Sequence, residues 1–232
     1  MKIAIIPARS GSRRIKNKNI VKIEGLPLMI SSMISAKKSK IFDKIHLSTD
    51  SIKYKNLAKK YNFFTLFLRD KKFSGNSIPV LDAVKSDLQN FEKRKFFYNE
   101  ICVLSATSPL ITHKDIIKVR KLFVKNKMKY PILSVCEYPA KIERALKLKK
   151  RKLEFINKKN VKKNTNVFQK TYYPTGNICY LHRSHLIKNK NYDLKYIPYF
   201  IDRFRAVDID ELKDLNFIKK IIKFQNKWKK IF

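Results

Sequence analysis

Short apolar runs separated by stretches with helical spacing constrain the fold of this chain more than any other feature. The runs at 3–7, 45–48, 63–68, 101–104 and 132–135 are rich in β-branched or aromatic residues. Runs that are apolar throughout are typical of strands buried on both faces, as in parallel sheets. We therefore predict a strand at each of these positions.

The stretches between the runs have the 3.6-residue spacing of helices that are apolar on one side, at 26–38, 51–61, 77–91 and 112–126. Strands that alternate with such helices form βαβ units, whose helices cover both faces of a sheet. The sequence therefore predicts an α/β fold, a three-layer α/β/α sandwich with a mainly parallel sheet.

The pattern changes after this region. Residues 141–170 carry the densest charge, with alternating apolar residues that predict an exposed hairpin, an arm of the kind that serves subunit contacts. The sheet is expected to resume at 177–181, and 210–229 has the spacing of a final helix. With 232 residues, 44% of them apolar, the chain can bury one substantial core. We expect a single domain over 1–232, with 141–170 as a protruding arm and a homodimer as the assembly.

The net charge of +36 raises the alternative of a nucleic-acid-binding module. The lysines are scattered over nearly every segment, however, and no zinc-finger spacing, basic heptad region or RNP-like strand pair is present. We interpret the charge as solvated surface, whose field would still attract polyanionic substrates such as nucleotides.

Other features exclude further classes of protein. The three cysteines have no CxxC spacing and are an odd number, which predicts reduced thiols in the core. No apolar run approaches the roughly 20 residues of a membrane span. The run at 3–7 is too short for a secretory signal. We expect a cytoplasmic protein with no membrane partner.

The segment 7–19, PARSGSRRIKNKN, follows the first predicted strand directly. Ligands of open α/β sheets bind outside the carboxyl ends of the strands, which is where this loop must lie. Backbone N–H groups around its single glycine can approach an anion, and its arginines and lysines can neutralise a triphosphate. The loop matches neither GxxxxGK[ST] nor GxGxxG, so it indicates neither a P-loop kinase nor a dinucleotide site. A solvated basic turn is the alternative.

The loop resembles the N-terminal signature of the acylneuraminate cytidylyltransferases, roughly ARxGSKxxxxKN. Further blocks match this family in order along nearly the whole chain: LSTD at 47–50, LFLR at 66–69, LSATSPL at 104–110, PAK at 139–141, YPTGN at 173–177 and VDID at 207–210. The resemblance implies a nucleotide-diphospho-sugar transferase-like fold and an enzyme that joins CTP to a nine-carbon acidic sugar, releasing pyrophosphate. It also implies Mg²⁺ as the cofactor.

The resemblance carries roles onto particular residues. It implies that the nucleotide is bound by the loop and by one distant arginine: Ala8, Arg9, Ser10, Gly11, Ser12, Arg13, Lys18, Asn19 and Arg69. It implies an acceptor pocket built from Ser105, Thr107, Ser108, Lys141, Thr175, Gly176 and Asn177. Arg9, Lys18 and Asp208 would carry the chemistry. Turn formation or surface exposure is the alternative for several of these acceptor residues.

Asp208 and Asp210 are the implied metal ligands. Two carboxylates at i and i+2 of an extended segment point the same way and can present hard oxygen ligands to Mg²⁺. The alternative for Asp210 is a helix N-cap, since a predicted helix follows it.

Departures from the family pattern fall mostly on the acceptor side. Ser105 stands where Gln is usual, Ala106 where Pro is usual, and Ile111 where Arg is frequent. We therefore expect triphosphate binding to be intact and the acceptor to be open among N-acetylneuraminate, legionaminate, pseudaminate and related sugars. An eight-carbon 3-deoxy-octulosonate is the alternative acceptor.

Overall fold

The computed structural model describes residues 1–188 and 194–229. In these residues the strands are β1 (Lys2–Pro7), β2 (Lys22–Ile23), β3 (Leu26–Pro27), β4 (Lys44–Ser48), β5 (Glu100–Leu104), β6 (Ile132–Glu137), β7 (Leu146–Lys149), β8 (Lys152–Phe155), β9 (Tyr172–His182) and β10 (Ile197–Phe200). The α-helices are α1 (Leu28–Lys38), α2 (Ile52–Lys60), α3 (Val80–Glu92), α4 (His113–Lys125), α5 (Arg183–Lys188) and α6 (Leu212–Lys229).

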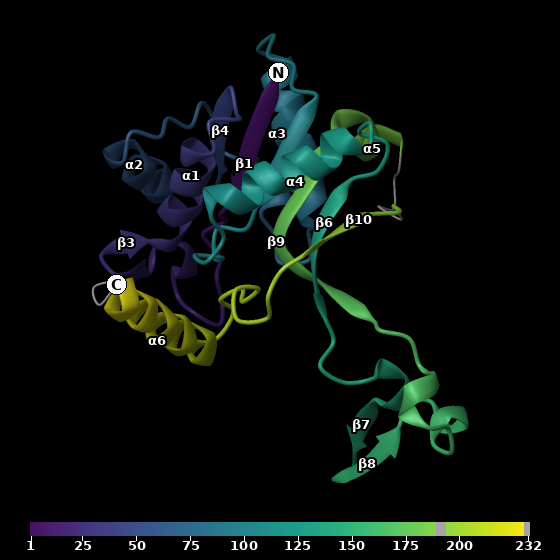
Figure 1. Cartoon of the computed structure of the whole chain (residues 1–232). Coiled ribbons are helices and arrows are strands. Elements are labelled where there is room, and N and C mark those ends of the chain that lie inside the picture. The colour runs from purple at the N-terminus through teal and green to yellow at the C-terminus, as the bar shows by residue number, and fades with distance from the viewer. Residues whose placement is uncertain (189–193, 230–232) are drawn as a thin grey trace.

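The central sheet has the strand order β10-β6-β9-β5-β1-β4 (Figure 1). β1 pairs in parallel with β4 and β5, and β10 pairs in parallel with β6. β9 is antiparallel to both of its neighbours, β5 and β6. The mainly parallel sheet is therefore confirmed, with one antiparallel strand inside it.

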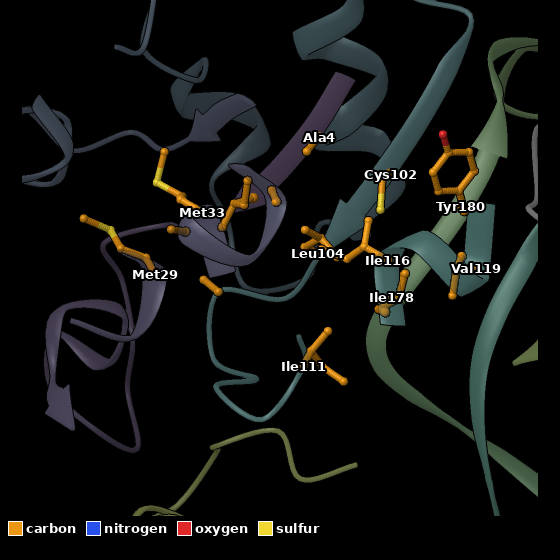
Figure 2. Packing of buried hydrophobic residues seen from close by; sticks show 14 of the residues in the cluster. Ala4, Met29, Met33, Cys102, Leu104, Ile111, Ile116, Val119, Ile178 and Tyr180 are labelled. Atoms are coloured by element: carbon orange, nitrogen blue, oxygen red, sulfur yellow. The ribbon is translucent and has the colours of Figure 1, made fainter. Parts of the chain in front are cut away.

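Helices cover both faces of this sheet, as the sequence predicts. Residues of α1, α2 and α4 share one buried cluster with the strands, and Figure 2 shows Met29 and Met33 of α1 and Ile116 and Val119 of α4 in that cluster. Residues of α3 and α5 form a second cluster against β1 and β5. Because each strand is apolar on both sides, it can fill both clusters, and the three-layer sandwich is confirmed.

The helix α6 packs away from these two clusters. Leu215 and Ile218 of α6 are buried together with three residues from other segments. These are Ile15 of the loop after β1, Leu28 at the start of α1 and Ile209 of the segment before α6. The apolar face of the last helix therefore covers the carboxyl end of the sheet and holds the segment before it beside that loop.

The segment 138–171 connects β6 to β9, and Figure 1 shows its hairpin β7–β8 standing apart from the central sheet. Leu146 pairs with Phe155, and Leu148 pairs with Leu153, so these four apolar residues share one face. Lys150 and Arg151 form the two-residue turn with φ of 45° and 64°. The predicted exposed hairpin is present.

The predicted strand at 63–68 is wrong. This segment is irregular and joins the central sheet at no point; just after it, Arg69 N donates to Thr49 O, the residue after β4, at 2.8 Å. Phe63, Thr65 and Phe67 are buried while the residues between them are exposed. An alternation of this kind looks like a strand in sequence, but here side-chain packing alone produces it. β10 and α5 were not predicted, and several predicted helices begin two or three residues early.

No helix among the described residues is long and apolar enough to cross a membrane. The three cysteines are free. Burial raises the pKa of Cys179 to about 12 and that of Cys102 well above its ordinary value, in agreement with core thiols.

A buried carboxylate, Asp115, fastens α4 to the chain before α6. It accepts hydrogen bonds from the backbone N–H of Thr112 at 2.8 Å and from the hydroxyls of Thr112 at 2.8 Å and Tyr199 at 2.9 Å, and it pairs with Arg205. Burial acts to raise its pKa, but these donors outweigh burial and hold the pKa below 3.8.

We predict that Asp115→Asn lowers the free energy of unfolding by about 2 kcal/mol at pH 7, because charge-assisted bonds to a buried carboxylate are lost. A depressed pKa stabilises the fold above the unfolded-state value and ceases to do so as the pH falls through the folded-state value. The difference between the two proteins in urea unfolding should therefore shrink below about pH 4. Asp70→Asn, at an exposed site, is the control, and a difference that does not shrink as the pH falls below 4 would contradict the assignment.

Candidate active site

The loop after β1 is tied to the end of β4. Ser10 donates to Asp50 twice, from its backbone N–H to Oδ1 and from its hydroxyl to Oδ2, each at 2.8 Å. Ala8 N donates to Ser48 O at 2.8 Å, and the buried Asn19 donates through Nδ2 to Arg9 O at 2.9 Å. The loop is therefore held at both its start and its end in one conformation.

Gly11 lies at the exposed tip of this loop. Arg9 folds back over it and donates from Nη1 to Gly11 O at 2.8 Å, and a Cβ at Gly11 would lie 3.2 Å from the same nitrogen. The glycine thus leaves room for the guanidinium of Arg9 to lie directly against the loop backbone.

A cavity of about 590 Å³ opens beside the loop, at the carboxyl ends of β1 and β5. Four cationic side chains and two carboxylates line it: Arg9, Arg13, Arg14, Lys18, Asp208 and Asp210. The remaining lining residues are Pro7, Ser12, Ile15, Asn19, Asn76, Val80, Val103, Ser105, Ala106, Thr107 and Gly176. A cavity of this size and charge at the carboxyl edge of a sheet suits a polyanionic ligand.

Asp210 binds two of the cations. Lys18 Nζ lies 2.8 Å from Oδ1 of Asp210, and Arg14 Nη2 lies 3.0 Å from the same oxygen. Partial burial acts to raise the pKa of Asp210, but the hydrogen bond and charge of Lys18, with Arg14, lower it overall. The start of α6 is served instead by Asp214, which accepts the backbone N–H groups of Asp210 and Glu211. The carboxylate of Asp210 therefore faces the cations of the loop and is not the helix cap.

Asp208 is bound by neutral groups. The hydroxyls of Ser105, at 3.0 Å, and Thr107 both donate to its Oδ1. Burial raises the pKa of Asp208, and although the two hydroxyls and the charge of Lys18 act against burial, the pKa stays above its ordinary value. The two neighbouring carboxylates thus have opposite environments.

The two carboxylates can hold a divalent cation, because Mg²⁺ is usually bound by one or two protein carboxylates together with phosphate oxygens. Both line the same cavity as the loop. No cluster of three or more His, Cys, Asp or Glu side chains occurs in the described ranges, so a site built from protein ligands alone is not found there.

Most of the predicted site residues meet at this cavity, among them Arg9, Lys18 and Asp208. Ala8, Ser10 and Gly11 belong to the loop but do not line the cavity. Four predicted residues are placed elsewhere or buried behind it: Arg69, Ser108, Thr175 and Asn177. Lys141 lies at the base of the arm.

Arg69 is buried and binds the end of β4. Its Nε donates to Ser48 Oγ and its Nη2 to Ser48 O, both at 2.8 Å. Burial lowers its pKa, and Asp87 and Asp50 act against that effect. Here Arg69 supports the strand end from which Asp50 holds the loop, and its contact with a nucleotide stays a prediction.

Three other residues predicted to contact the acceptor sugar donate hydrogen bonds to groups of the protein itself. Lys141 Nζ donates to Phe168 O at 2.8 Å. Thr175 donates to Ser134 Oγ at 2.7 Å, and Asn177 Nδ2 donates to Ser108 Oγ at 2.6 Å. Their roles toward a sugar stay predictions.

Gly176 is the part of this block that reaches the cavity. It has φ of 71°, and the β6–β9 pairing shifts register beside it, between Leu133 and Val135. A residue without a side chain suits this left-handed conformation, which turns the backbone of β9 toward the cavity.

Some lining residues escaped the sequence-based prediction. Arg14 stands next to Arg13 in the loop, and the doubled arginine was the available signal. Asn76, before α3, and Val80, its first residue, reach the cavity only through tertiary packing. Asp50 was visible in the LSTD block, but its bonds to Ser10 were not.

An α/β sandwich with a cationic loop and two carboxylates at the carboxyl edge of its sheet is an arrangement that suits a nucleotide-handling enzyme. The family model described as cytidylyltransferase matches residues 3–231. The chain belongs to the cytidylyltransferase family.

Curated relatives match over nearly their full length. A pseudaminic acid cytidylyltransferase of Campylobacter jejuni strain 81-176 is 30% identical, covering 95% of this chain and 96% of the relative. A CMP-N,N'-diacetyllegionaminic acid synthase of Campylobacter jejuni strain NCTC 11168 is 30% identical, covering 97% and 96%. The chain is thus similar to enzymes that differ in the sugar they are named for.

A solved structure described as CMP:2-keto-3-deoxy-manno-octonic acid synthetase complexed with CTP resembles the chain with a TM-score of 0.73 and 11% identity. It covers 97% of this chain and 99% of that one. At this identity the likeness shows the fold, which agrees with the α/β sandwich.

We predict that Asp50→Ala lowers the free energy of unfolding by about 2 kcal/mol and weakens CTP binding, because both bonds to Ser10 are lost. Ser10→Ala, which keeps the backbone bond, should cost about half as much. Urea unfolding and calorimetric titration with CTP measure the two effects. Equal losses in the two variants would contradict a contribution from the backbone bond of Ser10 to Asp50.

Proposed function

We propose that this enzyme transfers the cytidylyl group of CTP to a nonulosonic, sialic-acid-like sugar, giving the CMP-sugar and pyrophosphate. The observation that carries the proposal is the cavity in which the cations of the loop and the carboxylates Asp208 and Asp210 face one another. Family membership supports the nucleotide, and the relatives named for pseudaminic and legionaminic acids support the acceptor.

The cationic side chains of the loop bind the triphosphate. Arg9 can present a guanidinium fork to phosphate oxygens, while Lys18 is a point charge that is only 17% exposed. Lys18 and Arg14 both pair with Asp210 in the structure. Arrival of the triphosphate gives both cations a more highly charged partner, and Asp210 is then released to face the nucleotide.

The residues predicted to bind the metal fit Mg²⁺, with Asp208 and Asp210 as its protein ligands. When bound, Mg²⁺ neutralises charge on the phosphate oxygens as pyrophosphate leaves. The cations of the loop line the cavity beside the two carboxylates and would receive the triphosphate there.

In the transfer, the oxygen of the sugar's anomeric hydroxyl forms a bond to the α-phosphorus of CTP. The bond from that phosphorus to the bridging oxygen of pyrophosphate breaks, and the hydroxyl proton passes to solvent water. Lys18 and Arg9 stabilise the negative charge that grows on the leaving pyrophosphate. This arrangement needs no covalent intermediate on the protein.

The acceptor side of the cavity is lined in part by apolar groups, Val80, Val103 and Ala106, beside the backbone of Gly176. The pseudaminic and legionaminic acid relatives match over nearly the whole chain at 30% identity, whereas the likeness to the octulosonate enzyme, at 11% identity, shows only the fold. We therefore favour the nine-carbon acceptor over 3-deoxy-octulosonate.

We predict pyrophosphate release from CTP and Mg²⁺ with at least one nonulosonic acid from a panel of neuraminate, legionaminate and pseudaminate. Lys18→Ala should reduce kcat/KM on the order of 10²-fold, because a phosphate-binding cation is lost in the transition state. Lys16→Ala is the matched control, since Lys16 is an exposed lysine of the same loop outside the cavity lining.

Other outcomes of the assay decide between the alternatives. Turnover with 3-deoxy-octulosonate alone would move the acceptor to eight-carbon sugars. No turnover with any sugar, together with salt-sensitive retardation of DNA, would favour the nucleic-acid-binding module.

The proposal extends to the assembly, with 1–232 as one nucleotidyltransferase domain and 141–170 as an arm that joins two copies. The apolar face of the arm is solvent-exposed in the single chain, with Leu148 at 73% and Leu153 at 66%. A second apolar patch, from the same arm of another copy, would remove this face from water and form a homodimer.

We predict that the unaltered protein elutes as a dimer and that Leu148→Asp with Leu153→Asp elutes as a monomer in light-scattering chromatography. A carboxylate at these positions opposes burial of the apolar face. Ile52→Asp, on α2 and 64% exposed, should leave the dimer intact. A monomeric unaltered protein at micromolar concentration would contradict the arm's role.

A further inference from the structure

Two hydroxyl groups at the end of β5 converge on one oxygen of Asp208. Ser105 Oγ donates to Asp208 Oδ1 at 3.0 Å, and Thr107 Oγ1 donates to the same oxygen. Ser105 Oγ also accepts the backbone N–H of Thr107 at 3.1 Å. The three side chains form one hydrogen-bonded group inside the wall of the cavity.

The hydroxyl protons of Ser105 and Thr107 already form hydrogen bonds to Asp208. A hydroxyl has one proton to donate, and each of these two hydroxyls donates its proton to Asp208. The contact of 3.1 Å between the two hydroxyl oxygens therefore adds no second full bond. Neither hydroxyl can donate to a ligand without releasing the carboxylate.

The backbone holds both sides of this group in place. Ser105 N donates to Asn177 O at 3.0 Å, and Ile209 N donates to Thr107 O at 3.1 Å. Ile209 is fully buried in the cluster that packs α6 against the loop after β1. The loop after β5 and the segment before α6 are thus fastened together at the position of Asp208.

The environment of Asp208 differs from that of Asp210 in a way that suits a metal ligand. Cations neutralise Asp210, whereas the hydroxyls on Asp208 fix its orientation without cancelling its charge. Since both hydroxyl bonds end on Oδ1, the rotation of the carboxylate is set, and Oδ2 is left for the cavity that Asp208 lines.

We propose that Ser105 and Thr107 are positioning residues that hold Asp208 in the orientation needed to bind the divalent cation of the CTP complex. The sequence resemblance instead implies that both contact the acceptor sugar. This inference rests on the proposed function, and it assigns the two hydroxyls to the nucleotide half of the reaction.

Calorimetric titration of the protein with CTP tests the proposal in the absence of sugar, so that no reaction takes place. It is done once in Mg²⁺ and once in EDTA. We expect Thr107→Val to weaken CTP binding about 10- to 100-fold in Mg²⁺ and to leave it unchanged in EDTA, as loss of a group that orients a metal ligand does. Ser105→Ala should act in the same direction. Thr107→Ser, which keeps the hydroxyl, should restore binding, and thermal unfolding checks that each variant is folded.

Steady-state rates supply the second measurement. We expect Thr107→Val to raise the Mg²⁺ concentration needed for half-maximal rate and to leave the KM for the sugar within about twofold. A raised sugar KM with unchanged Mg²⁺ dependence would overturn the proposal and return the hydroxyls to the acceptor. If the unaltered protein binds CTP and turns over but Thr107→Val changes neither Mg²⁺ dependence nor binding, this inference alone fails. If the unaltered protein does not bind CTP with Mg²⁺, the proposed function fails with it.

Discussion

The hydrogen bonds between Ser10 and Asp50 are the interaction on which the site depends. β1 and β4 are neighbours in a parallel sheet, so their carboxyl ends lie side by side, and the loop after one can be fastened to the residues after the other. A loop rich in arginine and lysine would otherwise repel itself and remain unordered. Asp50 provides a fixed acceptor beneath it, and Arg69 supports the same strand end.

Electrostatic asymmetry is the second constraint. Four cations and two carboxylates share one cavity, but the carboxylates are not equivalent. Asp210 pairs with the cations Lys18 and Arg14, while Asp208 accepts hydrogen bonds from the hydroxyls of Ser105 and Thr107. In the proposed function, a triphosphate would replace Asp210 as the partner of Lys18, and Asp208 and Asp210 would hold the divalent cation. The surface charge of the rest of the chain contributes attraction at longer range.

Sequence patterns predicted the fold where a residue's own segment decided its structure. The strands β1, β4, β5 and β6 are short apolar runs because both faces of a parallel sheet are buried. The segment 63–68 has a strand-like alternation without a strand, since its alternate side chains are buried while its backbone forms no ladder with the edge strand β4. β9 is antiparallel to β6 because the chain reverses direction in the arm between these two strands. No local sequence pattern indicates this direction.

The sequence by itself determined the chemistry present at the site: the loop with Arg9 and Lys18, the carboxylates of the VDID block, and the order of the blocks that mark the family. The tertiary structure decided which of these groups meet and which atoms remain free. Lys18 and Asp210 are far apart in the chain and 2.8 Å apart in space, whereas Lys141 is turned to the backbone of the arm. The physical reason is that hydrogen bonds form between neighbours in space, and only the packing of α6 and the sheet edges brings these segments together.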